Sequence, residues 1–272
     1  TKKFFKNSVE GSNYTRDIIK EYNIDCDVTG NSNYVVAHHP NKFKVFQEQA
    51  DVYKNEFGIE TEIYSKEEFN DIGHGGTEQF GAFSYKPGFA INPLKFINGI
   101  TKYALTKKLR IFENTKVDQI DKDNGSYILR TKDGSVRSKK IVVATNGFYQ
   151  EGLIPQMDGR VLPVISNIIV TRQLTKSEIE AHNFKTFLPI ANTKNLLYYY
   201  RKLPDNRILF GTRGDLTGSD QSNLAMSKKM EKFLKDIFPQ WSNLMIDYNW
   251  RGLIALSQKL APSIGKIDNE EI

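Results

Sequence analysis

The sequence lacks the features that would place it in several common protein classes. It contains one cysteine, Cys26, in 272 residues. No disulfide can therefore form within the chain, which is consistent with a reducing cytoplasm. A lone cysteine is more typical of a small buried apolar residue than of a nucleophile. No run of about 18 apolar residues occurs, so we predict no membrane span and a cytoplasmic protein.

The sequence also lacks the short motifs of nucleotide, metal and hydrolase sites. No Gly-x-Gly-x-x-Gly, the fingerprint that holds a pyrophosphate at a helix N-terminus, follows a predicted strand. The nearest match, Gly73-His-Gly-Gly-Thr-Glu78, has glutamate at the third glycine position, so we expect residues 73–81 to be a plain loop. No cysteine–histidine cluster is present. We predict no metal site, and no metal or triad role for the four histidines, His38, His39, His74 and His182.

The charge of the chain gives little support for a polyanionic partner. The formal net charge is +6, but lysine and arginine are scattered along the chain rather than gathered in a stripe. No nucleic-acid-binding motif accompanies them. The composition, 39% hydrophobic and 26% charged, is ordinary for a globular domain. We therefore predict a solvated basic surface and no nucleic-acid partner.

The first half of the chain predicts helices joined by short strands. Helical periodicity covers residues 9–23, 41–57 and 92–108, and short strands are expected over 33–38 and 109–113. Ser65-Lys-Glu-Glu68 is a capping box, and Asn92-Pro93 is a strong helix start. In the helix after Asn92 we expect five apolar residues to face inward: Leu94, Ile97, Ile100, Ala104 and Leu105.

Residues 117–148 predict three short strands separated by Asn-Gly and Asp-Gly turns. The last strand, Ile141–Ala144, is wholly apolar and ends on Thr145-Asn-Gly147. One interpretation is a buried parallel strand whose carboxyl end meets a ligand crevice. The other is an ordinary buried strand followed by a turn. Spacing alone does not separate these two interpretations.

After Phe148 the pattern changes to long alternating strands. We predict strands over 161–171 and 247–257, a hairpin formed by 196–203 and 207–211, and a helix over 223–237. Thr175-Lys-Ser-Glu178 is a second capping box. The predicted fold class is α+β. An α/β-like portion around 92–150 stands beside a mainly antiparallel β-sheet with flanking helices.

Tyr198-Tyr-Tyr-Arg201 lies on a predicted strand, so Tyr198 and Tyr200 face one way while Tyr199 and Arg201 face the other. One face would then combine an aromatic wall with a fixed cation, which suits a carboxylate or a flat ring. The alternative is a sheet whose tyrosines are simply core and rim residues. Local sequence favours this alternative.

Several segments together resemble the D-amino-acid-oxidase-like family of FAD-dependent oxidoreductases, in particular its gamma-glutamylputrescine oxidase-like branch. No single segment is diagnostic, but all occur in the order found in the family. The matching segments are 23–27, 86–93, Val117, 143–148, 161–165, 199–213, the Trp250-x-Gly252 pattern and 261–265.

The resemblance implies FAD as the cofactor of the full-length protein. In family members the residue matching Val117 meets the adenine through its backbone. The sheet at the positions of Tyr199, Tyr200 and Arg201 covers the isoalloxazine ring and lines the substrate cavity. The segment near the flavin matches Thr145, Asn146 and Gly147.

One position departs from the family pattern. Glycine-oxidase-like members place a carboxylate-binding arginine shortly after the Trp-x-Gly pattern, and here that position is Ile254. This departure argues against simple recognition of an α-amino acid through that residue. Arg201 and Arg251 are candidates to replace it.

The resemblance also implies a domain division. A partial FAD-binding domain would comprise 1–30, 92–150 and 258–272, and a substrate-binding domain 31–91 and 151–257. Family members would have roughly 80 further residues at each end, the size of one supersecondary module. The chain thus resembles a central part that lacks the N-terminal Gly-x-Gly-x-x-Gly module and the C-terminal closing segment. We expect neither tight FAD binding nor activity from this part alone.

The implied activity is oxidation of the C–N bond of a small amine or amino acid. A hydride passes to flavin N5, and the imine is then hydrolysed, so the cofactor carries the chemistry and the protein orients the substrate. The alternative is a non-catalytic substrate-binding or interaction module that does not bind FAD by itself. Neither the identity of the amine nor the oligomeric state follows from the sequence.

Overall fold

The computed structural model describes residues 2–262 and 264–266, and the chain divides into two compact units. The sheet unit comprises residues 1–108 and 167–251, and the hairpin unit comprises 109–166 and 252–272. These bounds differ from the functional division implied by the family resemblance, which stays a prediction. Of the segments named for that division, Thr1, Ser263 and residues 267–272 lie outside the described residues.

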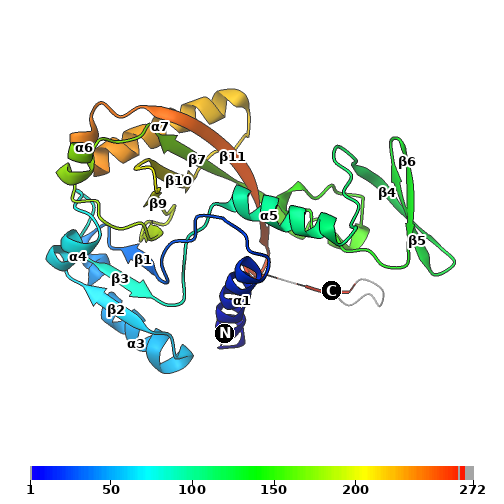
Figure 1. The fold of residues 1–272 in the computed structure, drawn as a ribbon, viewed down its shortest axis with the longest axis horizontal. Coiled ribbons are helices and arrows are strands. Elements are labelled where there is room, and N and C mark those ends of the chain that lie inside the picture. Colours follow the sequence, from blue (N-terminus) through cyan, green and yellow to red (C-terminus); the bar gives the residue numbers. More distant parts are fainter. Residues whose placement is uncertain (1, 263, 267–272) are drawn as a thin grey trace. The chain divides into compact units, whose positions relative to one another are not determined.

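The sheet unit is built on an eight-stranded sheet in the order β11-β7-β10-β9-β8-β1-β3-β2. Most of its strands are labelled in Figure 1. Pairing is antiparallel for β1–β3, β2–β3, β8–β9 and β9–β10, and parallel for β1–β8. The predicted α+β class with a mainly antiparallel sheet is therefore confirmed. The strands are β1 Asn33–Val36, β2 Thr61–Tyr64, β3 Ala82–Tyr85, β7 Val161–Thr171, β8 Ile190–Asn192, β9 Tyr199–Lys202, β10 Ile208–Arg213 and β11 Ile246–Ser257.

The helices begin largely where the sequence places their caps. Both predicted capping boxes are present, at Ser65 and at Thr175, and the Asn92 side chain accepts a hydrogen bond from the Lys95 backbone N–H at 3.2 Å. The single helix predicted over 41–57 is instead two. The helices are α1 Lys2–Glu21, α2 Pro40–Phe43, α3 Phe46–Phe57, α4 Lys66–Ile72, α5 Pro93–Thr106, α6 Lys176–Ala181 and α7 Asp220–Ile237.

The break between α2 and α3 follows from how two phenylalanines pack. Phe43 and Phe46 contact each other edge to face, with ring centroids 5.8 Å apart, in the cluster under β3. The Phe43 ring also occupies the space that a side chain at Gly81 would need. The predicted periodicity of apolar residues is present, but the chain turns once so that both rings enter one cluster.

Two helices cover opposite faces of the sheet. Tyr34 and Val36 of β1 belong to the large core with α7, whereas Val35 packs in the cluster beneath α3. This alternation is the period of two expected for a strand buried on both faces. In the large core, α7 lies beside β10 (Figure 1) and contributes Met230 and Leu234, both fully buried.

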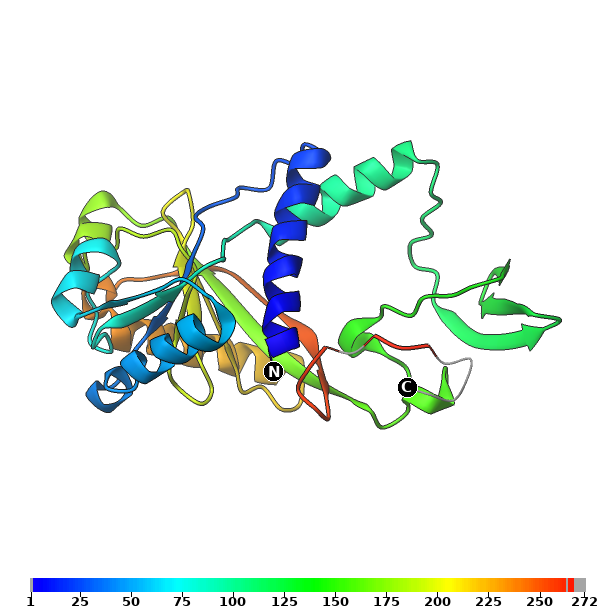
Figure 2. The ribbon, with the colours of Figure 1, turned by 90° about the horizontal axis from the view of Figure 1, so that it is seen from below.

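Helices α1 and α5 cross and pack through a small apolar cluster (Figure 2) that includes the buried Cys26. The predicted inward face of α5 is wrong at three positions, because Leu94, Ile97 and Leu105 are all more than half exposed. The reason is Gly99, whose missing side chain leaves room for Ile24 against the helix. That close approach turns the stripe of Phe96, Ile100 and Tyr103 inward, and Tyr103 stacks on Tyr22 at 3.7 Å.

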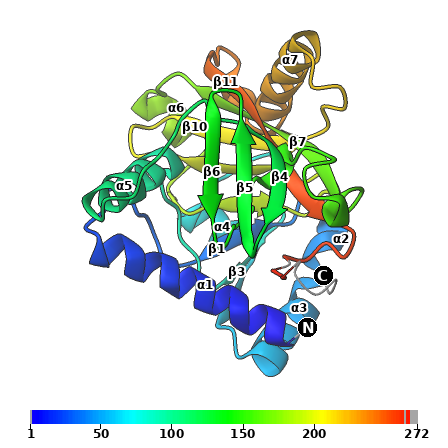
Figure 3. The same cartoon turned by 90° about the vertical axis from the view of Figure 1, so that its right-hand side faces the viewer.

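The hairpin unit contains a three-stranded antiparallel sheet, β4 Val117–Asp123, β5 Ser126–Thr131 and β6 Gly134–Ser138 (Figure 3). The predicted Asn-Gly turn is confirmed, because Asn124 and Gly125 both have left-handed φ angles of 47° and 75°. Two short 3₁₀ helices follow, η1 Asn146–Phe148 and η2 Pro155–Met157. A third, η3 Pro239–Trp241, lies in the sheet unit.

Two predicted strands are absent from the hairpin unit. Residues 109–113 and 141–144 have no strand structure, and Val142 is 91% exposed. An apolar run becomes a buried strand only if neighbouring strands pair with it on both sides. No strand within residues 2–262 pairs with either segment, so both predictions are wrong for the described chain.

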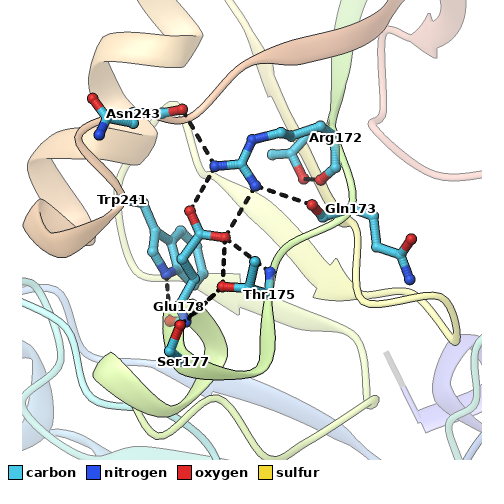
Figure 4. A network of polar contacts seen from close by, with 8 residues as sticks. Arg172, Gln173, Thr175, Ser177, Glu178, Trp241 and Asn243 are labelled. Carbon is cyan, nitrogen blue, oxygen red and sulfur yellow. Dashed lines mark hydrogen bonds and ion pairs between the residues drawn. The ribbon is translucent and has the colours of Figure 1, made fainter.

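An ion pair joins α6 to the end of β7 (Figure 4). The Arg172 guanidinium donates to both carboxylate oxygens of Glu178, at 2.6 and 3.0 Å. This hydrogen bonding is the main reason that the pKa of Glu178 lies at about 2. The Glu178 backbone carbonyl accepts from Trp241 Nε1 at 2.7 Å, and Arg172 also donates to the Asn243 carbonyl at 3.4 Å. The pair therefore holds the fully buried Trp241 in place.

His74 lies fully buried in an aromatic cage behind β9. Its Nε2 is 2.9 Å from the hydroxyl oxygen of Tyr200, and its ring stacks on Phe184 with centroids 5.1 Å apart. Burial lowers the pKa of His74 to about 3, so the imidazole is neutral in the folded protein. His74, for which the sequence suggested no metal or catalytic role, is thus a core residue.

We predict that folding stability falls as pH drops from 6.5 towards 3. Unfolded His74 takes up a proton near pH 6.5 whereas folded His74 does not, so its contribution is complete above pH 6.5 and declines below it. Between pH 7 and pH 5 this amounts to about 2 kcal/mol. Urea unfolding of His74→Gln should show a smaller loss over this range. Exposed His39→Gln is the control, and equal losses in both variants would contradict the assignment.

Candidate functional site

The candidate site lies on the face of β9 that points away from the large core. Tyr198 and Tyr200 are buried in that core, whereas Tyr199 and Arg201 are half-buried on the opposite face. The predicted alternation is therefore confirmed. Tyr198 and Tyr200 are the core tyrosines of the alternative interpretation, and Tyr199 and Arg201 form the aromatic–cation pair.

Tyr199 lies flat across the neighbouring strand. Gly211 of β10 is its partner in the antiparallel register, and a side chain at 211 would overlap the Tyr199 ring. Glycine in a strand interior often marks such a close approach. The absence of a side chain at 211 therefore leaves the space that the Tyr199 ring occupies.

Arg201 is a half-buried cation whose guanidinium is only partly used. It donates to the Ile91 carbonyl at 2.9 Å. Burial lowers the pKa of Arg201, and the negative charge of Asp27 opposes that effect at longer range. Asp27 itself pairs with Lys95 at 2.6 Å and accepts from Asn92 at 3.3 Å. No carboxylate of the described residues lies within ion-pair distance of Arg201, so its remaining donors are free for an anionic ligand.

Two other predicted residues lie elsewhere in the sheet unit. Tyr200 faces the core and hydrogen-bonds His74, so it supports β9 from behind. Arg251 donates to the Ser219 carbonyl at 2.7 Å and to the Asp220 carboxylate at 3.2 Å. These are the N-cap and first residue of α7, so Arg251 anchors that helix end. Their assignment to a substrate cavity stays a prediction.

The predicted flavin-side residues gather around η1 in the hairpin unit. Asn146 has a left-handed φ of 53°, and its side-chain oxygen accepts from the Ala255 backbone N–H at 3.0 Å. Gly147 is buried, and a Cβ there would lie 2.7 Å from Leu253 Cβ. Thr145 precedes this turn as the η1 N-cap. The segment is thus held against the end of β11, where Ile254 occupies the position noted in the sequence.

Val117 opens β4 of the same unit. It pairs with Thr131, and the register then shifts before Gln119. A bulge of this kind leaves backbone groups outside the regular ladder. The role of Val117 in cofactor binding stays a prediction, as do those of Thr145, Asn146 and Gly147.

Sequence reasoning missed two features of the site. Gly211 carried a detectable signal, since a glycine inside an apolar strand pattern indicates a close backbone or side-chain approach. The ion pair of Asp27 and Lys95 gave no signal in the sequence, because 68 residues separate the two in the chain. Only folding brings it near Arg201.

The described residues hold neither a cluster of metal-ligating side chains nor a helix that could cross a membrane. Residues 2–262 and 264–266 contain no group of three or more His, Cys, Asp or Glu side chains placed to hold a metal ion. No helix in this part of the chain has the length and apolar character needed to cross a membrane.

Comparison with known proteins identifies the family. Residues 2–271 match the family described as DAO, FAD dependent oxidoreductase. The chain belongs to this family. It is 26% identical over 273 residues to the probable oxidoreductase OrdL of Haemophilus influenzae, covering 97% of this chain and 60% of that protein. It is 27% identical to the gamma-glutamylputrescine oxidoreductase of Escherichia coli, covering 95% of this chain and 59% of that protein. The chain thus spans about three fifths of these relatives.

Solved structures show the same fold. Glycine oxidase from Geobacillus kaustophilus superposes with a TM-score of 0.74 at 15% identity, covering 94% of this chain and 67% of that one. L-proline dehydrogenase from P. horikoshii gives a TM-score of 0.72 at 19% identity, covering 97% and 70%. At these identities the likeness concerns the fold alone.

We predict that Gly211→Ala displaces the Tyr199 ring and destabilises the protein. The added methyl group would overlap the ring, and such overpacking typically costs about 1–3 kcal/mol. Gly252→Ala is the matched control, because nothing lies within 4 Å of its added Cβ. Chemical denaturation and near-ultraviolet circular dichroism of both variants provide the measurement. Equal behaviour of the two variants would contradict the described position of Tyr199.

Proposed function

We propose that the chain forms the substrate-facing part of an FAD-dependent oxidoreductase that oxidises the C–N bond of a small amine or amino acid. The observation that carries this proposal is the placing of Tyr199 and Arg201 together on the half-buried face of β9. The family and the activities for which the relatives are named support it. The gamma-glutamylputrescine oxidase-like branch and a cytoplasmic location are part of the proposal.

Each unit, taken by itself, offers residues that could contact FAD. In the sheet unit the Tyr199 ring over Gly211 suits a flat ring. In the hairpin unit the tightly packed turn at Asn146 and Gly147 is hydrogen-bonded to the end of β11. The 272-residue sequence contains no Gly-rich loop of the kind that holds the pyrophosphate. We therefore propose that Val117 and residues 145–147 contribute to FAD binding without being sufficient for it.

The side chains would act by binding and orientation. Arg201 would hold an anionic group of the substrate, and Tyr199 would form the wall along which the substrate lies. FAD, when bound, supplies the two-electron acceptor. The hydrogen bond between His74 and Tyr200 keeps β9 fixed, so the geometry of Tyr199 and Arg201 is set before the substrate arrives. The predicted substrate-binding domain, residues 31–91 and 151–257, contains all four residues.

The full-length protein tests this proposal. We expect two flavin absorbance bands, and we expect an amine or amino acid to bleach them anaerobically. Arg201→Met should raise the KM for a carboxylate-bearing substrate by at least tenfold, because it removes a charge-assisted hydrogen bond of about 1.5–3 kcal/mol.

Arg251→Met is the comparison variant for that experiment. It should lower the melting temperature by releasing the start of α7 and leave KM within about twofold. A full-length protein without flavin, or flavin that no amine reduces, would overturn the proposed function. A KM effect in Arg251→Met alone would transfer the anion-binding role to Arg251.

The alternative function is a binding module without catalysis, and the absence of a pyrophosphate loop favours it for the 272-residue chain alone. We predict that this chain, purified by itself, carries no stoichiometric FAD and shows no oxidase activity. Fluorescence titration with FAD is the measurement. A Kd for FAD below about 1 μM, which corresponds to a binding free energy of about −8 kcal/mol, would contradict our assignment of the cofactor-binding segments.

A further inference from the structure

Arg213 lies on the same face of the sheet as Tyr199 and Arg201. The β9–β10 register pairs Leu209 with Arg201 and Gly211 with Tyr199. Because alternate residues of a strand share a face, Arg213 at the end of β10 continues the row of Leu209 and Gly211. The flat Tyr199 ring therefore lies between two arginine positions. Arg213 is four residues beyond Leu209, the partner of Arg201, so the two arginine positions are offset by about 13 Å along the strand direction at the usual rise per residue.

The Arg213 guanidinium is partly buried without a partner. Its Nε atom is buried and makes no hydrogen bond, and no carboxylate of the described residues forms an ion pair with its side chain. Among the other arginines of the same unit, Arg172, Arg207 and Arg251 each pair with a carboxylate, and Arg16 donates to the Gly30 and Gly88 carbonyls. Arg213 and Arg201 are thus two unpaired cations on one face.

The nearest acid in sequence does not neutralise Arg213. Asp215 accepts hydrogen bonds from the Gly218 backbone N–H at 3.1 Å and from the Ser222 hydroxyl at 2.7 Å. Both bonds use Oδ1 and serve the start of α7, whereas Oδ2 is buried without a hydrogen-bond partner, and Asp215 forms no ion pair with Arg213 among the described residues. A partly desolvated guanidinium with unused donors is unfavourable unless an anion completes it. The physical expectation is that a ligand supplies that anion.

We propose that Arg213 is a second anion-binding residue of the substrate site, so that the preferred substrate is an amine carrying two anionic groups. One group binds Arg201, the other binds Arg213, and the carbon chain between them lies over the Tyr199 ring. This inference rests on the proposed function and adds the substrate class to it.

The test uses the full-length flavoprotein and unreactive ligands. The probes are the straight-chain dicarboxylates from succinate to suberate, and butyrate as the monocarboxylate. A further probe, 3-phosphonopropanoate, distinguishes a phosphate-like second group from a carboxylate. Binding is measured from the change in the flavin spectrum and from calorimetry. We expect the best dicarboxylate or the phosphonate to bind at least tenfold more tightly than butyrate.

Arg213→Gln should reduce this preference to within about twofold and leave butyrate binding unchanged. Arg213→Lys should retain part of it, since the charge remains. Arg110→Gln, at an exposed arginine without an ion pair among the described residues, is the matched control and should keep the full preference. Melting curves verify that each variant is folded.

The outcomes separate this inference from the proposed function. If the wild type shows no preference for two anionic groups, the role of Arg213 is refuted. The same follows if Arg213→Gln weakens butyrate and dicarboxylates equally, even while amines reduce the flavin and the proposed function stands. If no amine reduces the flavin, the proposed function fails, yet loss of the dicarboxylate preference in Arg213→Gln would still establish a two-anion site.

Discussion

The hydroxyl of Tyr200 and Nε2 of His74 meet 2.9 Å apart in the core behind β9. The geometry of the candidate site depends on this contact. Tyr200 and its neighbours Tyr199 and Arg201 are consecutive in the chain, so fixing one side chain inward directs the other two outward. The imidazole is neutral and surrounded by aromatic rings, which makes the hydrogen bond strong and its loss costly. The half-buried face of β9 is therefore positioned by the packing of its buried face.

The chemical character of the candidate site comes from positive charge that no carboxylate of the described residues neutralises. Three of the six arginines of the sheet unit pair with a carboxylate of the described residues, as Arg172 does with Glu178. Arg201 retains unused N–H donors. Asp27, the carboxylate whose charge acts on the pKa of Arg201, is already paired with Lys95. Positive charge is therefore left on the face that carries the flat Tyr199 ring. Such a face favours anionic, planar or extended ligands over cationic ones.

The sequence predicted the local features well where short-range chemistry decides them. Both capping boxes, the Asn92 helix start and the Asn124-Gly125 turn are present, because each depends on residues three or four apart. It failed where burial depends on partners distant in the chain. Residues 141–144 have the composition of a buried strand, yet no described strand pairs with them. The face of α5 was misassigned because Gly99 packs against Ile24, 75 positions away.

The candidate site divides in the same way. The alternation of Tyr198, Tyr199, Tyr200 and Arg201 was determined by the sequence alone, since a strand has a period of two. The sequence alone did not determine which face of β9 is buried, because the burial depends on α7 and on His74. Only the tertiary structure placed Gly211 under Tyr199 and left Arg201 without a carboxylate. Register between strands and the positions of distant charges are long-range properties, and no local pattern encodes them.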